Sequence, residues 1–322
     1  MTTKSKTKSK SNSSRTYKNH NSVQKKQKIA LLFLTMDNLY QPTIWEKFIA
    51  SEYFKEHFNI YCHPKNPTKV TQSFLKKNIL PREYLKETKW GYLVNAYYSL
   101  LEYAYKNKEN IKFIYVSDSC IPLYQPEYIY SKLMKDQYSY IDTKSISFTK
   151  YDYLSRYSKR KKQYRSNGIT KFIKHSGWFC LNRQDAGVIL QNKQAMKFLN
   201  TVKAGDEHIL TILYSKQRKP TIKEQAITHV EWKLNIYETY EKDRQKLWQQ
   251  FDKIGNTTGN EKKKKDLLGK IQKLKEDMLH DISHPRLFDI ITKTDVKNIY
   301  QTPALFLRKV SKNSDISLLK NH

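Results

Sequence analysis

The sequence contains few glycines, few cysteines and no long apolar run. Among its 322 residues there are 8 glycines, and they form neither a G-x-G-x-x-G pattern nor a phosphate-binding loop. Nucleotide binding through either of these two loops is therefore excluded. The 3 cysteines, Cys62, Cys120 and Cys180, are scattered and odd in number, which argues against a disulfide framework and fits a reducing compartment. We expect each of them to be a small buried residue, not a nucleophile or a zinc ligand.

No apolar stretch is long enough to cross a bilayer, because the longest, residues 29–34, has the length of a buried strand. The first 28 residues contain nine Lys or Arg and no acid, and they lack the apolar segment that a secretion signal needs. We therefore expect residues 1–28 to be a disordered basic tail, and we expect no transmembrane segment. The predicted location is the cytoplasm or a soluble compartment similar to a viral factory.

Acidic residues are scarce, since 30 Asp and Glu accompany 60 Lys and Arg and leave a net charge of +30. Such a charge attracts polyanions, so the basic tail is expected to contact nucleic acid, another polyanion or an anionic membrane. A dedicated nucleic-acid-binding protein is therefore an alternative function class. Against it, no helix-turn-helix, zinc-finger or aromatic RNA-binding motif occurs, and the basic residues are spread over the whole chain.

The sequence does contain an alternation of apolar strands and amphipathic helices. Continuous apolar runs predict strands at residues 29–34, 58–62 and 111–116, and periodic apolar residues predict helices from Thr43 and over 92–105. This alternation is typical of a parallel sheet that is buried on both faces, so the predicted fold class is α/β. In such folds the ligand binds beyond the carboxyl ends of the strands.

Two segments differ from this pattern. Residues 151–174 are rich in Lys and Arg with interleaved tyrosines, and they predict a long basic loop that is mobile unless an anion orders it. Residues 241–280 contain two charged helical patterns on either side of a turn with two glycines, which predicts an inserted helical hairpin. We therefore expect one domain over residues 29–311, interrupted by this insertion, and a C-terminal tail over 312–322.

Several short motifs occur together in one order along the chain, and in this order they resemble the core-2/I-branching β-1,6-N-acetylglucosaminyltransferases. This is glycosyltransferase family 14, and the resemblance is strongest to its plant-type branch. The motifs are Trp45-Glu-Lys-Phe48, Ile60-Tyr-Cys-His-Pro64, Trp90-Gly91, residues 116–124, residues 175–179 with Asn182-Arg183, residues 205–208, His284-Pro-Arg286 and residues 305–309.

The resemblance implies a GT-A fold, a Rossmann-like domain with a mixed, mostly parallel sheet and helices on both faces. It implies an inverting transfer of a sugar from a UDP-sugar, usually UDP-N-acetylglucosamine, to a hydroxyl of a glycan or glycoprotein. UDP-xylose and UDP-glucose are alternative donors, and a degenerate scaffold that only binds polyanions is the rival hypothesis. No Asp-x-Asp motif occurs in the chain. The core-2 branch uses basic side chains in place of a divalent metal, so no metal and no cofactor is expected.

The resemblance also assigns residues to the reaction. Glu207 matches the catalytic base, and Asp206 is expected to be the N-cap of a helix that begins there. Arg286 and Lys309 match the basic residues that take up the charge of the departing diphosphate. Arg308 is an equal alternative to Lys309, because the alignment does not distinguish these neighbours.

The remaining candidates form the two sides of the expected pocket. The resemblance places Asp118, His63 and Trp90 on the donor side, and Trp178 and Ser176 on the acceptor side. An ordinary structural role is the alternative for three of them: His63 as a loop histidine, and Trp90 and Trp178 as residues of the core.

Overall fold

The computed structural model describes residues 26–143, 156–216, 221–232, 236–254 and 260–319. Most of the predicted basic tail, residues 1–25, lies outside this description, and so does the first part of the predicted basic loop, up to residue 155. Among the described residues, no helix combines the length and the apolar character that crossing a membrane requires.

The centre of the molecule is a six-stranded sheet with the strand order β2-β1-β3-β6-β5-β7. Strand β6 is antiparallel to both of its neighbours, and the other pairs are parallel. The predicted α/β class with a mixed, mostly parallel sheet is therefore confirmed. The strands are β1 (Lys28–Thr35), β2 (Phe58–Pro64), β3 (Asn110–Ser117), β5 (Ser139–Ile141), β6 (Cys180–Asn182) and β7 (Ile222–Glu224).

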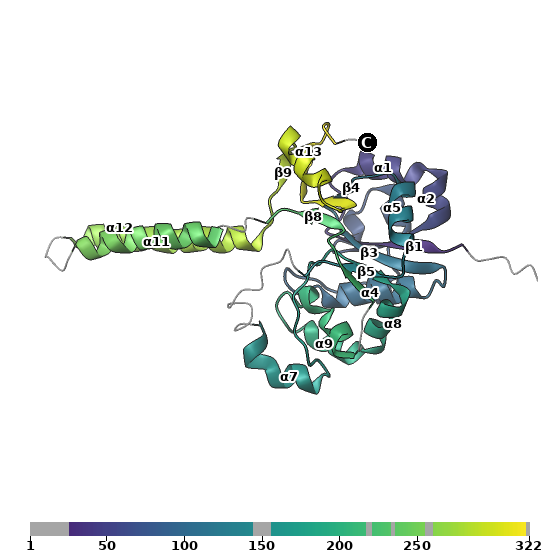
Figure 1. Ribbon diagram of the computed structural model, residues 1–322, viewed down its shortest axis with the longest axis horizontal. Helices are drawn as coiled ribbons and strands as arrows, with labels where there is room; N and C mark the ends of the chain where they lie inside the picture. Colours follow the sequence, from purple (N-terminus) through teal and green to yellow (C-terminus); the bar gives the residue numbers. More distant parts are fainter. Residues whose placement is uncertain (1–25, 144–155, 217–220, 233–235, 255–259, 320–322) are drawn as a thin grey trace, which may run out of the picture.

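Both faces of this sheet are covered by helices (Figure 1). Along β1, Ile29 and Leu31 face a core that includes Trp45, whereas Ala30 and Leu32 belong to the core on the other face. This burial on two sides explains why the strand is a continuous apolar run and not an alternating one. One layer contains α1 (Pro42–Ala50), α2 (Glu52–His57) and α5 (Pro126–Met134), and the other contains α4 (Val94–Tyr105), α8 (Arg183–Gln191) and α9 (Lys193–Leu199).

Two smaller sheets follow the central one. Strand β10 (Phe306–Arg308) lies between β4 (Cys120–Pro122) and β8 (Thr228–Val230), and β9 (Phe288–Ile290) pairs with β11 (Val310–Asp315). These strands share an apolar cluster that includes Ile121, Phe288 and Leu307. Helix α13 (Lys293–Tyr300) packs onto this cluster through Ile299. The segment predicted as a tail from residue 312 thus differs from the structure. Its first part is a strand, and Leu319 is buried in the apolar cluster.

The helices α3 (Ser73–Lys77), α7 (Lys161–Ser166) and α10 (Thr211–Lys216) complete the core region. The described part of the basic segment, residues 156–174, is packed against this core and differs from the mobile loop that we expected. Tyr157 and Tyr164 are buried, and Phe172 stacks on Tyr157 with ring centroids 4.6 Å apart. The interleaved aromatic residues therefore anchor a segment whose charges suggested a solvated loop.

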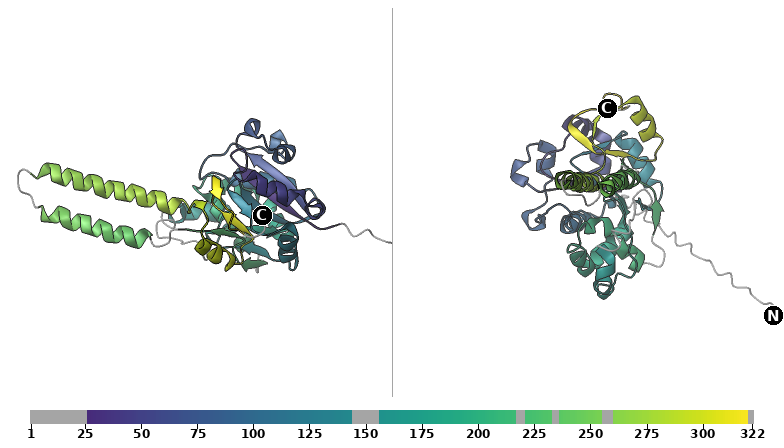
Figure 2. Two further views of the ribbon diagram at one scale, coloured as in Figure 1. Left: turned by 90° about the horizontal axis from the view of Figure 1, so that it is seen from above. Right: turned by 90° about the vertical axis from the view of Figure 1, so that its left-hand side faces the viewer.

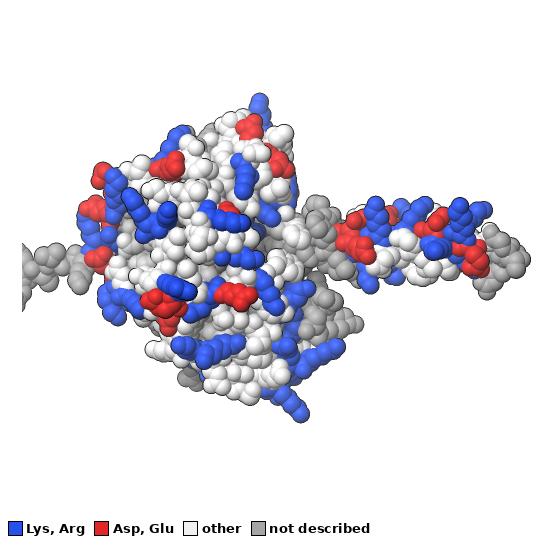
Figure 3. Space-filling model, turned by 180° about the vertical axis from the view of Figure 1, so that it is seen from behind, with Lys and Arg blue, Asp and Glu red and all other residues white. Residues whose placement is uncertain are grey.

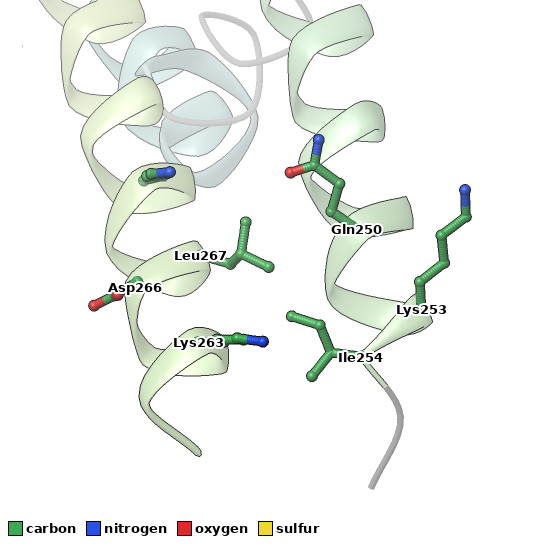
Figure 4. A pocket seen from close by; sticks show the side chains of 7 residues that line it. Gln250, Lys253, Ile254, Lys263, Asp266 and Leu267 are labelled. Atoms are coloured by element: carbon green, nitrogen blue, oxygen red, sulfur yellow. The ribbon is translucent and has the colours of Figure 1, made fainter. Parts of the chain in front are cut away.

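Helices α11 (Ile236–Lys253) and α12 (Glu261–Ser283) form a long antiparallel arm that projects from the core (Figures 1 and 2). Both extend beyond the predicted hairpin at 241–280. Ile254 and Leu267 point toward each other between the helices and line a hollow of about 380 Å³ (Figure 4). Leu267 is the one buried side chain among those described on the arm.

Candidate active site

The turn after β3 places Asp118 at the carboxyl ends of the parallel strands, where a ligand site is expected. Its carboxylate accepts a hydrogen bond from Met36 N at 3.0 Å, and its backbone oxygen accepts one from Tyr40 N at 2.9 Å. Asp118 therefore connects the end of β3 to the segment that leaves β1. Burial raises the pKa of its carboxyl group, while Arg308 and Lys309 act against this rise.

Strand β10 ends at Arg308, and Arg308 and the following residue Lys309 lie near Asp118. Arg308 Nε donates to Ser117 Oγ at 3.3 Å, and the guanidinium lies 4.6 Å from the centre of the Trp178 ring. Burial and the nearby Arg308 charge lower the pKa of Lys309, whereas Asp118 raises it. We call Asp118, Arg308 and Lys309 the Asp118 end of the site.

Arg286 has different neighbours from the ones we predicted. Its guanidinium donates to both oxygens of Asp295, at 2.7 and 3.1 Å, and to Glu231 at 3.0 Å. The hydrogen bonds from Arg286 are the main cause that lowers the pKa of Asp295 to about 2. Asp295 also forms the capping box of α13 with Thr292. The pairing gives Arg286 a structural role that attaches the chain before β9 to α13, and its role toward a diphosphate stays a prediction.

The candidate base lies in a short 3-10 helix, η5 (Gly205–His208), and not at the start of a regular helix. The prediction that Asp206 caps this helix is wrong. The N-cap residue is Ala204, whose φ of 54° lies in the left-handed region, and the cap makes no side-chain hydrogen bond. A Cβ atom on Gly205 would lie 2.0 Å from Leu199 O, so only glycine fits. This tight, unusual turn is what places Asp206 and Glu207.

Two basic side chains hold the Glu207 carboxylate. Arg156 donates to Glu207 Oε2 at 2.8 Å, and Lys174 Nζ lies 3.9 Å from the same oxygen. The Glu207 side chain retains an exposed fraction of 24%. We did not predict these partners, although both belong to the basic segment at 151–174. Within the described residues, the carboxylate that this segment contacts is Glu207.

Asp206, the neighbouring acid, is buried. Desolvation is the largest cause that raises its pKa to about 7, and the Glu207 charge acts in the same direction. Its Oδ1 atom has no hydrogen-bond partner among the described residues. A Cβ atom on Gly177 would lie 3.9 Å from Asp206 Oδ2 and 3.0 Å from Tyr97 Oη. Asp206 therefore lies against the turn at Gly177, and its carboxyl group is largely protonated below neutral pH.

The segment 175–178 connects the two groups of charges. At one side His175 N donates to Glu207 O at 2.9 Å, and at the other the Trp178 ring lies beneath Arg308. Between them Ser176 N donates to Asp142 O, and Ser176 Oγ accepts from Trp178 N at 3.3 Å. We call Asp206 and Glu207, with Arg156 and Lys174, the Glu207 end. Both ends therefore lie along one short stretch of chain, and both acceptor-side candidates belong to it.

The other two donor-side candidates are placed differently. His63, at the end of β2, is buried, and its Nε2 atom accepts from Lys86 N at 2.8 Å. Burial is the main cause that lowers the pKa of His63 to about 4, so the ring is neutral. Trp90 is 65% exposed, which makes its alternative role as a core residue wrong. The donor-side roles of both residues stay predictions.

The three cysteines are buried and have no disulfide partners, as predicted. Within the described ranges, no three His, Cys, Asp or Glu side chains form a group that can hold a metal ion. The charged groups of the site are therefore carboxylates and basic side chains. Such an arrangement can bind an anion at the Asp118 end and accept a proton at the Glu207 end.

Comparisons with known proteins identify the family of the chain. Residues 29–261 match the model of the core-2/I-branching enzyme family. The curated proteins include a relative from Oryza sativa subsp. japonica, named glycosyltransferase BC10, which is 27% identical over 175 residues. The alignment covers 52% of this chain and 42% of that relative, so the chain matches less than half of the relative's length.

Proposed function

The chain belongs to the core-2/I-branching enzyme family, and on this premise we propose that it is an inverting glycosyltransferase. The proposed donor is UDP-N-acetylglucosamine, and the proposed acceptor is a hydroxyl of a glycan or glycoprotein. The observation that carries the proposal is the segment 175–178, which contacts the backbone carbonyl of Glu207 at one side and the Arg308 guanidinium at the other. Inverting transfer requires a base and a stabilised leaving group on opposite sides of one sugar ring.

Glu207 acts as the base in this proposal. The oxygen of the acceptor hydroxyl forms a bond to the anomeric carbon of the donor sugar. At the same time the hydroxyl proton moves to the Glu207 carboxylate, and the bond between the anomeric carbon and the diphosphate oxygen breaks. The electron pair of the broken bond leaves with UDP. Arg156 and Lys174 both contact Glu207 Oε2, so in this proposal the proton goes to the other carboxylate oxygen, Oε1.

Arg308 and Lys309 stabilise the departing UDP in this proposal. Two adjacent cations that are partly removed from water repel each other, and a diphosphate between them relieves that repulsion. Fixed charges of this kind stabilise a transition state by several kcal/mol, on the order of 3 for one well-placed donor. No divalent metal is needed in this scheme, because the side chains supply the positive charge. Trp178 lies where a flat ring can contact the transferred or the accepting sugar.

The experiment that tests the proposal measures UDP release from UDP-N-acetylglucosamine, UDP-xylose and UDP-glucose, with and without EDTA. We expect turnover of the first donor in EDTA. Glu207→Gln removes the base without changing the size of the side chain, and we expect it to lower kcat by about 10² to 10⁴. Glu52→Gln, at an exposed position of α2, is the matched control. Turnover that survives Glu207→Gln, or that requires a metal, contradicts the proposal.

The rival function, polyanion binding, has the net charge in its favour. On the face shown in Figure 3, however, basic side chains are scattered over the core and alternate with acidic ones along the arm. A polyanion-binding surface is expected to form one basic band. A fall in affinity for DNA or heparin with rising salt, unaffected by Glu207→Gln and without any turnover of UDP-sugars, would favour this rival.

A further inference from the structure

Trp90 lies at the corner of a tight turn. Tyr92 N donates to Lys89 O at 2.9 Å, and Gly91 has a φ of 77°. A hydrogen bond between these positions and a positive φ at the third residue are features of a type II turn, which favours glycine there. The second position, which Trp90 occupies, is at the outside of such a turn. The backbone therefore holds an apolar side chain of large area in solvent.

This turn is attached to the segment that contains the candidate base. Ala204 N donates to Gly91 O at 2.7 Å, and Glu207 N donates to Ala204 O at 3.1 Å. A Cβ atom on Gly91 would lie only 3.3 Å from Lys203 Cγ, so the two segments are in close contact. Two backbone hydrogen bonds thus connect the turn of Trp90 to Glu207. The backbone that carries Trp90 is therefore close to the backbone that carries Glu207.

Polar groups surround the exposed indole. The His284 ring lies 6.3 Å from it, centre to centre, with an angle of 18° between the planes, and Lys203 Nζ lies 5.1 Å from its centre. These residues come from three distant parts of the chain: the turn, the segment before η5 and the end of α12. Lys203 lies over the indole ring and His284 stacks on it, so a pyranose that stacks there with its apolar C–H face would replace one of these contacts and meet N–H donors with its hydroxyl groups.

The other tryptophans of the described chain are covered to a greater extent. Trp45 is fully buried, Trp178 lies under Arg308, Trp232 is half-buried, and Trp248 on the arm is 37% exposed, against 65% for Trp90. Large aromatic residues are usually buried, and an exposed one on a rigid turn is typical of a recognition surface. Its place next to the candidate base makes a carbohydrate the fitting ligand.

We propose that Trp90, Lys203 and His284 form an acceptor subsite, which binds an uncharged pyranose ring next to the ring that receives the transferred sugar. The inference rests on the proposed function, and it narrows the acceptor to glycans of at least two rings. It also moves Trp90 from the predicted donor side to the acceptor side. Because His284 directly follows α12, the base of the arm becomes part of the binding site.

The test compares wild type with Trp90→Ala and Trp90→Phe in the full chain. Chitobiose and lactose serve as acceptors, alongside the corresponding monosaccharides. For Trp90→Ala we expect the KM for both disaccharides to rise by about three- to tenfold, which corresponds to one aromatic contact. The Phe variant should recover part of this loss, and the KM for the UDP-sugar should show no comparable rise. Trp248→Ala, a tryptophan further along the arm, is the matched control.

A binding measurement without donor separates this inference from the proposed function. Saturation-transfer NMR with chitobiose and lactose reports contact with the protein even if no UDP-sugar is turned over. A signal that is present in wild type and Trp248→Ala and lost in Trp90→Ala supports the subsite, whatever the transferase assay gives. If neither disaccharide gives a signal with wild type, or if Trp90→Ala raises the donor KM and leaves the acceptor KM unchanged, the subsite is refuted.

Discussion

The two ends of the candidate active site contain similar residues in different states. At the Asp118 end the carboxylate accepts a backbone hydrogen bond from Met36, and the neighbouring Lys309 is partly buried beside Arg308. At the Glu207 end the carboxylate is already paired, at 2.8 Å from Arg156. In the proposed reaction, the first end receives the diphosphate and the second end accepts the proton.

The difference follows from the elements that supply the charges. Arg308 and Lys309 are consecutive residues at the end of a strand, so the backbone holds both in place. Arg156 and Lys174 come from the basic segment, which is attached to the core through its aromatic residues. A site that binds a constant leaving group benefits from rigid charges.

The largest expected effect comes from breaking the backbone of the Glu207 end. In Gly205→Ala the new Cβ atom would lie 2.0 Å from Leu199 O, so the turn at Ala204 must move. We expect a loss of about 3 kcal/mol in the free energy of unfolding, measured with urea, together with loss of turnover. Gly269→Ala on the arm is the control, because a Cβ atom added there would meet no other atom within 4 Å. This control should gain about 0.5–1 kcal/mol, and equal effects at the two positions would contradict the prediction.

The next largest effect is expected when one of the two basic side chains at the Asp118 end is removed. Arg308→Ala removes the guanidinium that contacts both Ser117 and Trp178. We expect kcat to fall by about 10², since one fixed donor to a developing charge is lost. Arg308→Lys should recover part of the rate, and Lys312→Ala, an exposed position on β11, should leave it unchanged. A normal rate for Arg308→Ala would assign the diphosphate role to Lys309 alone.

A smaller effect concerns the proton on Asp206. The pKa of this buried acid is raised from 3.8 to about 7, through desolvation and the Glu207 charge and against the opposing Arg156 charge. A folded-state pKa above the unfolded one means that the folded protein holds the proton more strongly. The contribution of Asp206 to the free energy of unfolding is therefore fully present below about pH 4, and it declines as the pH rises from about 4 to 7.

Asp206→Asn imitates the protonated acid and should remove this decline, because the amide does not titrate. The measurement is the free energy of unfolding at several pH values between 4 and 8, with the wild type as reference. Asp136→Asn, at a carboxylate outside both ends of the site, is the control and should keep the wild-type slope in this range. An unchanged slope in Asp206→Asn would mean that Asp206 ionises as an ordinary surface acid.

The smallest effect on turnover is expected at Arg286, which has carboxylate partners of its own. We expect Arg286→Met to change the donor KM by less than about threefold, and to lower the free energy of unfolding by about 1 to 3 kcal/mol because Asp295 loses its partner. Kinetics and urea unfolding of the same preparation separate the two effects. A donor KM that rises more than tenfold would restore the phosphate role predicted from the sequence.

Local sequence features were sufficient for three strands of the central sheet and for part of the helices. The apolar runs at 29–34, 58–62 and 111–116 predicted β1, β2 and β3 to within two residues at each end, because burial on both faces requires such runs. Strand β11 was missed, since its polar residues lack an apolar pattern and only pairing with β9 defines it. The N-cap at Asp206 was predicted wrongly, because a left-handed alanine and a crowded glycine begin η5.

The candidate site shows the same division. The motif at 205–208 located Glu207, but not its pairing with Arg156, which lies 51 residues earlier in the chain. Likewise, the family resemblance of His284-Pro-Arg286 implied a phosphate contact, whereas Asp295 and Glu231 lie within hydrogen-bond distance of Arg286. Motifs specify which residue types are present. They do not specify which opposite charges come within reach after folding.

The amino-acid sequence by itself determined the α/β class, the apolar strands, the basic character of the chain and the motifs of its family. These properties depend on local composition and periodicity, which are independent of distant partners. Only the tertiary structure decided which charges are paired, which acid is buried and which tryptophan is exposed. Burial and electrostatic partners depend on distances between segments far apart in the chain, and folding alone sets those distances.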